Sequence, residues 1–409
     1  MGRELPSVGQ PPAAFKKNVR SKKAKVTINK VIPALLITHP RAKHGIDAAE
    51  LIARPPAQDL HAASIKGKPV PAAVANADES ELHIRLRVTD TLSAARELLR
   101  NSVTQKDDLS NRSARVGILN MASLLAPGGG FLNGASSQEE TLCMCTTLLP
   151  SLSDDFYRLP EVGGVYTPDV LVFRDEVAED LEKRDRWFVD CVSAGMLRFP
   201  SITVDEITGR GSYSSSKDRE LVIEKMRAVM RMFQAKSVKK VVLGAWGCGA
   251  YGNPVGEVAA AWKKVLLGGR HAQRSRKGRR ETWTGVETVV FAIKDAGLAD
   301  AFGQAFGDGL IPDDTEDVSK RDESEDDLEA EKLREMQEKI AEMELRIDQA
   351  RSPELKAGLT SILASLQSQV AGISVVAKAE HGVTGSDGGE SESGEDSSDS
   401  DVTYDSTAE

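Results

Sequence analysis

Residues 116 to 140 read VGILNMASLLAPGGGFLNGASSQEE and contain the strongest structural signal in the chain. The segment begins as an apolar strand, passes through three consecutive glycines, Gly128 to Gly130, and ends where a helix is expected to start. A backbone without side chains can come close to a ligand and point its N–H groups at an anion. The segment therefore predicts a strand-loop-helix unit whose loop wraps a diphosphate, although GGG alone is also typical of a simple turn.

A second segment of the same kind, VVLGAWGCGAYGNP, covers residues 241 to 254. Both loops follow the carboxyl ends of strands, so in an open α/β sheet they face one crevice and suggest a dinucleotide-like ligand. Gly247, Gly249 and Gly252 also satisfy the GxGxxG pattern of nicotinamide-dinucleotide enzymes. Residues 258 to 280 contain no Asp or Glu to hold the ribose hydroxyls, which disfavours an NAD-dependent oxidoreductase and leaves an NADP-dependent one open.

Strands alternate with helices on both sides of these loops. Several of the strands are apolar throughout, as in sheets that are covered on both faces. This alternation predicts an α/β protein with a mostly parallel or mixed central sheet. Strands are expected over residues 82–88, 116–120, 187–193, 238–246 and 286–293, and helices over residues 41–53, 91–99, 138–149, 217–234, 254–267 and 298–306.

The charge of the chain is distributed unevenly. The 409 residues contain 53 Lys and Arg against 62 Asp and Glu, for a net charge of −9. Residues 313–409 hold 27 acidic and 9 basic residues, so the rest of the chain is basic, with a balance of +9. A basic body is compatible with a phosphate-rich ligand, which the net charge of the whole chain would disfavour.

Composition divides the chain into five regions. The basic cluster KKNVRSKKAK, residues 16–25, predicts a disordered arm that is solvated, binds a polyanion or directs nuclear import. Residues 270–280, RHAQRSRKGRR, predict an exposed basic loop. Apolar residues spaced three and four apart within 328–372 predict a coiled-coil segment that forms either a helical hairpin or a self-association element. The expected regions are a basic arm (1–30), the α/β domain (31–310), an acidic linker (311–327), a helical segment (328–372) and a disordered acidic tail (373–409).

Several classes of protein are disfavoured. No apolar run reaches the 18 to 20 residues of a membrane span, and no signal peptide is recognisable, so we expect a soluble protein of the nucleus or cytoplasm. The four cysteines are too few and too irregularly spaced for a disulfide scaffold or a zinc site, and we expect reduced thiols. The histidines are scattered and no GxxxxGK[ST] occurs, so neither a metal centre nor a Walker-type nucleotide site is expected.

The triplet Gln138-Glu139-Glu140 would by itself be an ordinary charged first turn of a helix. Seven residues after GGG it is much more specific, because the pattern resembles the signature of macrodomain-fold poly(ADP-ribose) glycohydrolases: GGG, six to eight residues, then QEE. The chain is most similar to the microbial-type branch of bacteria and fungi. The resemblance includes LNMAS (119–123), YTPDVLVFRD (166–175) and the second glycine loop, and covers roughly residues 40–307.

This resemblance implies a three-layer α/β/α macrodomain with a mixed central sheet, no cofactor and no metal. It implies that the chain hydrolyses the ribose–ribose O-glycosidic bonds of poly(ADP-ribose) and releases ADP-ribose, with poly(ADP-ribosyl)ated proteins as partners. Glu140 would be the catalytic carboxylate, and Glu139 its neighbour that helps to bind the ribose. The remaining expected contacts are Asp90 at the adenine amine, Asn120, Gly128, Gly129, Gly130, Asn133, Gln138, Gly247, Cys248, Gly249, Ala250, Tyr251 and Gly252.

The spacing of the two glutamates limits the mechanism. Glycosidases with two catalytic carboxylates place them on opposite sides of the sugar. Adjacent residues on a helix diverge by about 100°, so Glu139 and Glu140 cannot form such a pair and one glutamate must act as both acid and base. Two alternatives remain open: a macrodomain that binds ADP-ribose without catalysis, and a hydrolase of mono-ADP-ribosylated targets.

Overall fold

The computed structural model describes residues 13–57, 82–100, 115–205, 207–268 and 281–311, together with Ile340 and Leu363. The chain divides into two compact units, residues 1–316 and 317–409. All the elements described below belong to the first unit. The expected basic loop and acidic tail lie outside the described residues, as does the expected helical segment apart from Ile340 and Leu363, which are helical.

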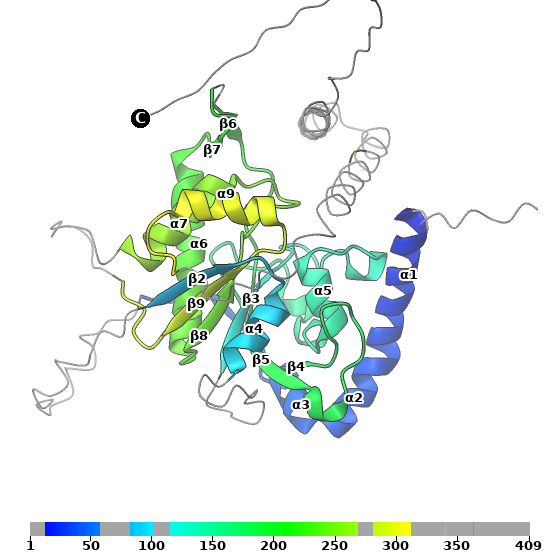
Figure 1. The fold of residues 1–409 in the computed structure, drawn as a ribbon. Helices are drawn as coiled ribbons and strands as arrows, with labels where there is room; N and C mark the ends of the chain where they lie inside the picture. The colour runs from blue at the N-terminus through cyan, green and yellow to red at the C-terminus, as the bar shows by residue number, and fades with distance from the viewer. Residues whose placement is uncertain are drawn as a thin grey trace, which may run out of the picture. The chain divides into compact units, whose positions relative to one another are not determined.

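A seven-stranded mixed sheet forms the centre of the first unit, in the order β1-β4-β5-β3-β8-β9-β2 (Figure 1). Strands β5, β3, β8, β9 and β2 are parallel to one another, and β4 is antiparallel to both β5 and β1. Because β3 and β8 are parallel neighbours, the two glycine loops leave the same edge of the sheet. The strands are β1 (Glu50–Ala53), β2 (His83–Arg87), β3 (Val116–Met121), β4 (Gly163–Val172), β5 (Trp187–Ala194), β8 (Lys240–Leu243) and β9 (Thr288–Ala292).

Helices cover both faces of the sheet. Each face has its own core beneath helices, which agrees with the expected α/β class (Figure 1). Side chains at the helix starts cap free backbone N–H groups, as when the Ser215 hydroxyl accepts from the amide of Lys217. The helices are α6 (Ser216–Ala235), α7 (Val255–Leu266) and α9 (Ala296–Phe306) on the first face, and α4 (Thr91–Leu99) and α5 (Gln138–Cys145) on the second.

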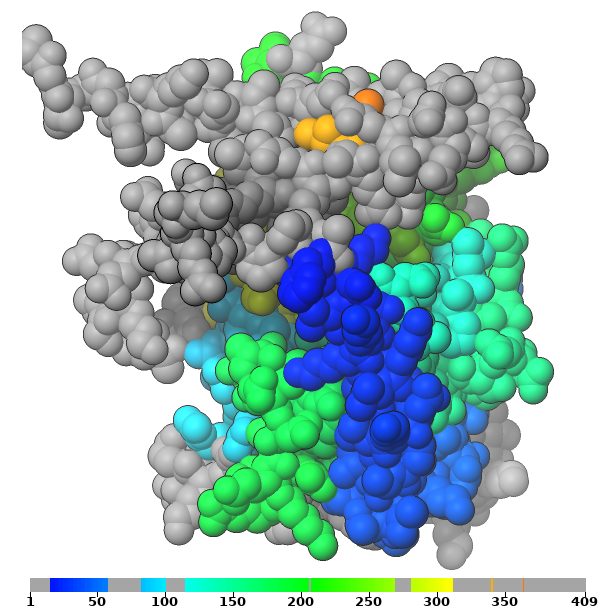
Figure 2. All heavy atoms as spheres, turned by 90° about the vertical axis from the view of Figure 1, so that its right-hand side faces the viewer, coloured from blue at the N-terminus to red at the C-terminus, as the bar shows by residue number. Residues whose placement is uncertain are grey.

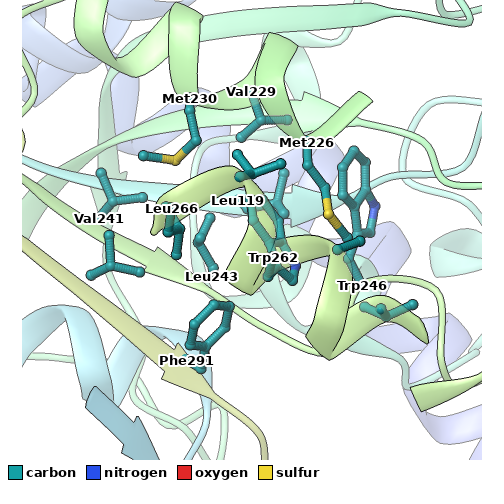
Figure 3. Close-up of a cluster of buried hydrophobic side chains, with 14 of the residues drawn as sticks. Leu119, Met226, Val229, Met230, Val241, Leu243, Trp246, Trp262, Leu266 and Phe291 are labelled. Carbon is teal, nitrogen blue, oxygen red and sulfur yellow. The ribbon is translucent and has the colours of Figure 1, made fainter. Parts of the chain in front are cut away.

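Alternation along the strands creates the two cores. In β8, Val241 and Leu243 pack into the core beneath α6, α7 and α9, whereas Val242 packs into the core on the opposite face. Figure 3 shows the first of these cores, in which the rings of Trp246 and Trp262 lie with their centroids 6.3 Å apart. Trp246 immediately precedes the second glycine loop, so its burial anchors the start of that loop.

The described part of the N-terminal arm, residues 13–30, is helical and not disordered, so the prediction is wrong for these residues. Helix α1 (Ala13–Val26) continues through a π-helical turn (Thr27–Val31) into α2 (Ile32–Thr38). Ala24 and Thr27 are fully buried, and Arg174 Nη1 donates to Thr27 Oγ1 at 2.8 Å. The density of lysines in the sequence obscured the small apolar face that packs against the domain.

Three further assignments differ from the prediction. The helix expected over 41–53 is α3 (Pro40–Asp47), followed by β1, which forms a sheet edge by pairing with β4. Helix α5 ends at Cys145 and not at residue 149, because the Cys145 carbonyl accepts hydrogen bonds from the amides of Phe173 and Arg174. Strand β4 and the small hairpin β6 (Ile202–Val204) and β7 (Gly211–Tyr213) were not predicted.

No helix in the described part of the chain is long and apolar enough to cross a membrane. The four cysteines are free thiols in the structure. Three of them are buried beside the sheet, and only Cys248, in the second glycine loop, is partly exposed.

Candidate active site

Gln138 fixes the first turn of α5 against the end of β3. Its Oε1 accepts from the amide of Met121 at 2.9 Å, and its Nε2 donates to the carbonyl of Leu119 at 2.8 Å and to Thr91 Oγ1 at 3.1 Å. Both donor hydrogens of the side-chain amide are therefore used within the protein. This arrangement favours a positioning role for Gln138 over the substrate contact that the resemblance implied.

Glu139 is held in a buried carboxylate site, with 4% of the residue exposed. The amide of Ser123 donates to Oε2 at 2.7 Å, and Asn120 Nδ2 lies 3.5 Å from Oε1. Burial, together with the nearby Glu140, raises the pKa of Glu139 to about 8, against the opposing effect of the Ser123 hydrogen bond. Glu139 is therefore mainly protonated at neutral pH.

The Glu140 carboxylate has one fixed oxygen and one free oxygen. The amide of Gly130 donates to Oε1 at 2.8 Å, so the first glycine loop orients the side chain. The second oxygen, Oε2, is buried and has no hydrogen-bond partner among the described residues. An unpaired buried carboxylate oxygen is costly, which makes it a natural contact for a ligand.

The first glycine loop requires glycine at the position next to both carboxylates. Gly129 has φ +55°, and a Cβ there would lie 2.8 Å from both Glu139 Oε2 and Glu140 Oε1. Gly128 has φ +67° and no room for a Cβ beside Leu149. The three consecutive glycines thus allow the loop backbone to lie directly against the two glutamates.

Asn120 and Asn133 occupy very different environments. Asn120 is fully buried at the end of β3, where its Nδ2 donates to Ser193 Oγ at 3.0 Å and its Oδ1 has no partner among the described residues. Asn133 is exposed in the short 3₁₀ helix η4 (Phe131–Asn133), and its amide donates to the Gly130 carbonyl at 2.9 Å. The Asn133 side chain is accessible, whereas Asn120 lies behind Glu139.

The second glycine loop is built around Asn253, a buried residue at its C-terminal end. Asn253 Nδ2 donates to the carbonyls of Gly247 at 3.0 Å and Leu197 at 2.9 Å, and Oδ1 accepts from the Tyr213 hydroxyl at 2.8 Å. Gly247 has φ +81°, and a Cβ there would lie 2.6 Å from Asn253 Nδ2. The base of the loop is therefore tightly packed.

The tip of the second loop is open. Gly249, Ala250 and Gly252 are exposed, and a Cβ at either glycine would meet nothing within 4 Å among the described residues. Cys248 is partly exposed, and its amide donates to the carbonyl of Ala245. A packed base and an open backbone tip are suited to holding an anionic ligand.

Tyr251 connects the two loops. Its hydroxyl is hydrogen-bonded to the side chain of Ser123, which follows β3, and burial raises the Tyr251 pKa. The guanidinium carbon of Arg198 lies 5.6 Å from the centre of the Tyr251 ring. The structure therefore brings the two predicted loops together on one edge of the sheet.

Asp90 caps helix α4 close to the same edge. Its Oδ1 accepts from the amides of Leu92 at 2.8 Å and Ser93 at 3.1 Å. The next residue, Thr91, contacts Gln138, so the starts of α4 and α5 are linked. Asp90 therefore has a structural function as an N-cap, whatever its contact with a ligand.

Two residues at the site were missed from the sequence. Tyr157 has a buried hydroxyl without a partner among the described residues, and burial together with the neighbouring Glu139 raises its pKa. Its surroundings, DDFYRLP, contain no recognisable motif. Asn253 belongs to the quoted GAYGNP segment, where its position just before a helix was the available signal. No group of three or more potential metal ligands occurs in the described parts of the chain.

Comparisons with known proteins give the following similarities. Residues 56–175 match the family model described as microbial-type PARG, catalytic domain. The crystal structure of poly(ADP-ribose) glycohydrolase from Thermomonospora curvata is 23% identical, with a TM-score of 0.50, over 71% of this chain and all of that chain. Its complex with the inhibitor ADP-HPD is 22% identical over the same shares of the two chains, with a TM-score of 0.48.

The glycohydrolase of Deinococcus radiodurans in complex with ADP-ribose is also similar, at 22% identity over 65% of this chain and 96% of that chain, with a TM-score of 0.47. No curated protein matches the sequence at a significant level. The matched family region contains the first glycine loop and both glutamates, and the T. curvata structure supports a shared α/β fold with a mixed sheet. The recognition made from the GGG and QEE motifs is confirmed.

Proposed function

Because residues 56–175 belong to the microbial-type poly(ADP-ribose) glycohydrolase catalytic-domain family, we propose that this chain hydrolyses the ribose–ribose O-glycosidic bonds of poly(ADP-ribose) and releases ADP-ribose. One observation carries the proposal. Glu140 is oriented by the glycine loop through Oε1, while its buried Oε2 has no partner among the described residues. A carboxylate placed in this way between two anion-binding loops is suited to protonating a glycosidic oxygen beside a diphosphate.

The diphosphate of the substrate lies between the two glycine loops in this proposal. The side-chain-free backbone of Gly128 to Gly130, whose Gly130 amide is engaged by Glu140, lies against the diphosphate on one side, and the open tip of residues 247–252 lies against it on the other. Tyr251 packs against the ribose at the reacting end, and the exposed Asn133 binds a ribose hydroxyl. Asp90, which has one oxygen occupied as a helix cap, contacts the adenine amine with the other. The departure of both glycine loops from one edge of the mixed sheet supports this arrangement.

The chemistry uses a single glutamate. Glu140 gives its proton to the leaving ribose oxygen as the bond from that oxygen to the anomeric carbon breaks, and an oxocarbenium-like sugar forms beside the diphosphate. Water then attacks the anomeric carbon and returns a proton to the Glu140 carboxylate. The negative diphosphate and the Glu140 carboxylate left after proton transfer stabilise the positive charge that develops on the sugar. No metal takes part in these steps.

Glu139 has a different task. Its carboxyl group is mainly neutral below about pH 8 and is held by the Ser123 amide. A neutral carboxyl can donate a hydrogen bond to the ribose next to the scissile bond without adding a second negative charge beside Glu140. Glu139 therefore binds and orients the sugar. Asn120 contacts the Glu139 carboxyl group, and Gln138 holds the first turn of α5, which contains both glutamates, against β3.

The proposal is tested by incubating the purified chain with poly(ADP-ribose) of defined length and with mono-ADP-ribosylated proteins, and separating the products by chromatography. We expect release of ADP-ribose from the polymer. Glu140→Gln should lower this rate by at least about a hundredfold, since general acid and base catalysis are lost, while ADP-ribose still binds. Binding without release would support a non-catalytic ADP-ribose binder, and activity confined to the mono-ADP-ribosylated proteins would support the other hydrolase.

A further inference from the structure

Helix α1 lies directly against the loop that follows the three glycines. Arg20 Nε donates to the carbonyl of Gly134 at 2.7 Å, and Ser21 Oγ donates to the carbonyl of Leu132 at 2.6 Å. Figure 2 shows α1 in dark blue on the molecular surface, beside the teal segment of the chain that follows β3. Residues more than a hundred positions apart in sequence therefore meet at the candidate active site.

The contact between α1 and the loop is a close backbone approach. Gly134 has φ +78°, and a Cβ there would overlap the carbonyl oxygen of Lys17 and lie 3.1 Å from the amide nitrogen of Ser21. Any larger residue at position 134 would push the helix and the loop apart. The helix and the glycine therefore fit each other through main-chain atoms as well as through the Arg20 and Ser21 side chains.

The loop transmits this contact to Glu140. The amide of Gly134 donates to Phe131, and the amides of Asn133 and Ala135 both donate to the carbonyl of Gly130. The amide of Gly130 in turn donates to Glu140 Oε1 at 2.8 Å. The turn from Gly130 to Gly134 is thus held by α1 on one side and holds the catalytic carboxylate on the other.

The other half of α1 is anchored to the body of the domain. Ala24 is fully buried, and Lys23 Nζ donates to the carbonyl of Ala178 at 2.8 Å. Beyond the end of α1, buried Thr27 accepts from Arg174, whose guanidinium also donates to the carbonyl of Met144 near the end of α5. The π-helical turn that continues α1 and helix α5 are therefore both attached to Arg174, so that α1 is a fixed support and not a loosely attached arm.

We propose that α1 is part of the catalytic apparatus, with Arg20 and Ser21 as positioning residues that hold the Gly130–Gly134 turn so that the Gly130 amide stays on Glu140. This inference rests on the proposed function. It predicts that loss of the clamp lowers turnover, because the carboxylate loses its fixed orientation. The basic charge of α1 contributes separately, through general attraction of a polyanion.

Arg20→Gln and Lys22→Gln separate the clamp from the charge. Both variants remove one positive charge from α1, but Lys22 is exposed and has no recorded bond to the loop. We expect kcat of Arg20→Gln to fall roughly tenfold, the loss typical of one hydrogen bond from a charged donor, with Lys22→Gln retaining wild-type kcat. Arg20→Lys should restore most of the activity, since an ammonium also donates to the Gly134 carbonyl. Equal kcat for Arg20→Gln and Lys22→Gln would overturn the inference.

Gly134→Ala tests the same contact from the loop side, with Gly209→Ala as its control. Gly209 has φ +65°, similar to that of Gly134, but a Cβ there would meet nothing within 4 Å among the described residues. Both substitutions strain the backbone, and only Gly134→Ala separates the loop from α1. We expect at least a roughly tenfold larger loss of kcat from Gly134→Ala. Equal losses would contradict the role of α1.

Amide hydrogen exchange distinguishes failure of this inference from failure of the proposed function. Arg20→Gln should accelerate exchange at Gly130 and leave the amides of β8 unchanged, whether or not the chain hydrolyses the polymer. If the wild-type protein lacks hydrolase activity but Arg20→Gln shows this exchange pattern, the proposed function is refuted and the clamp is retained. Wild-type activity with unchanged Gly130 exchange in Arg20→Gln would refute the clamp alone.

Discussion

Gly129 lies where a single added carbon should disturb both glutamates. In the structure, a Cβ at this position would lie 2.8 Å from Glu139 Oε2 and from Glu140 Oε1, closer than Cβ contacts in real proteins. The substitution Gly129→Ala therefore forces the carboxylates to retreat by about 0.5 Å, and the bond from Gly130 to Glu140 must lengthen. The left-handed backbone at φ +55° adds roughly 1–2 kcal/mol of strain for alanine.

We expect the two consequences to be separable. The strain should lower the free energy of unfolding by about 1–2 kcal/mol, which urea denaturation measures. If Glu140 has the proposed role, displacement of its carboxylate should lower kcat/KM for polymer hydrolysis by about ten- to a hundredfold, because small misplacements of reacting groups cost large factors in rate. Gly209→Ala carries similar strain without the contact. If Gly129→Ala retains the kcat/KM of Gly209→Ala, the placement of the loop against the glutamates is wrong.

Three further outcomes follow from the site. The pKa of Glu139 is raised in the folded chain, so the wild type loses stability as pH rises towards 8 and the buried carboxyl ionises. The Tm of Glu139→Gln, which does not titrate, should therefore rise relative to the Tm of the wild type between pH 5 and pH 9. A Tm difference that stays constant over this range would contradict the raised pKa. Asn253→Ala removes the side-chain donor of the Leu197 carbonyl and the acceptor of the buried Tyr213 hydroxyl. It should cost about 3 kcal/mol of stability and weaken ADP-ribose binding in calorimetry; an unchanged urea midpoint would contradict this. Deleting residues 313–409 removes a net charge of −18, which repels the anionic polymer, so KM for the polymer at low salt should fall while kcat stays unchanged. A lower kcat would show that these residues contribute to catalysis.

The predictions that succeeded rest on local chemistry. The two glycine loops were placed after the correct strands, since an apolar run followed by glycine and a helical pattern has few other solutions. The adjacency of β3 and β8 makes both loops leave one edge of the sheet, as the sequence predicted for an α/β fold. The recognition of the family followed from GGG and QEE at their characteristic spacing.

The predictions that failed concern segments whose structure depends on distant partners. The segment KKNVRSKKAK was interpreted as a disordered arm because its lysines hide a face of only a few small residues. Its helix is stabilised by Arg174 and by the loop around Gly134, both more than a hundred residues away. Strand β1 was included in a helix because its strand character comes from pairing with β4, which periodicity within the segment does not report.

The sequence by itself determined the class of fold, the two glycine loops and the position of the glutamate pair at the start of a helix, because each depends on residue types at fixed local spacing. Tertiary structure decided what the neighbouring residues do. Burial makes Glu139 a carboxyl with a pKa of about 8, and close approach of Gly130 orients Glu140. Packing of α1 against Gly134 joins the basic N-terminal segment to the candidate active site. These properties arise from groups brought together across the chain, and no local pattern encodes them.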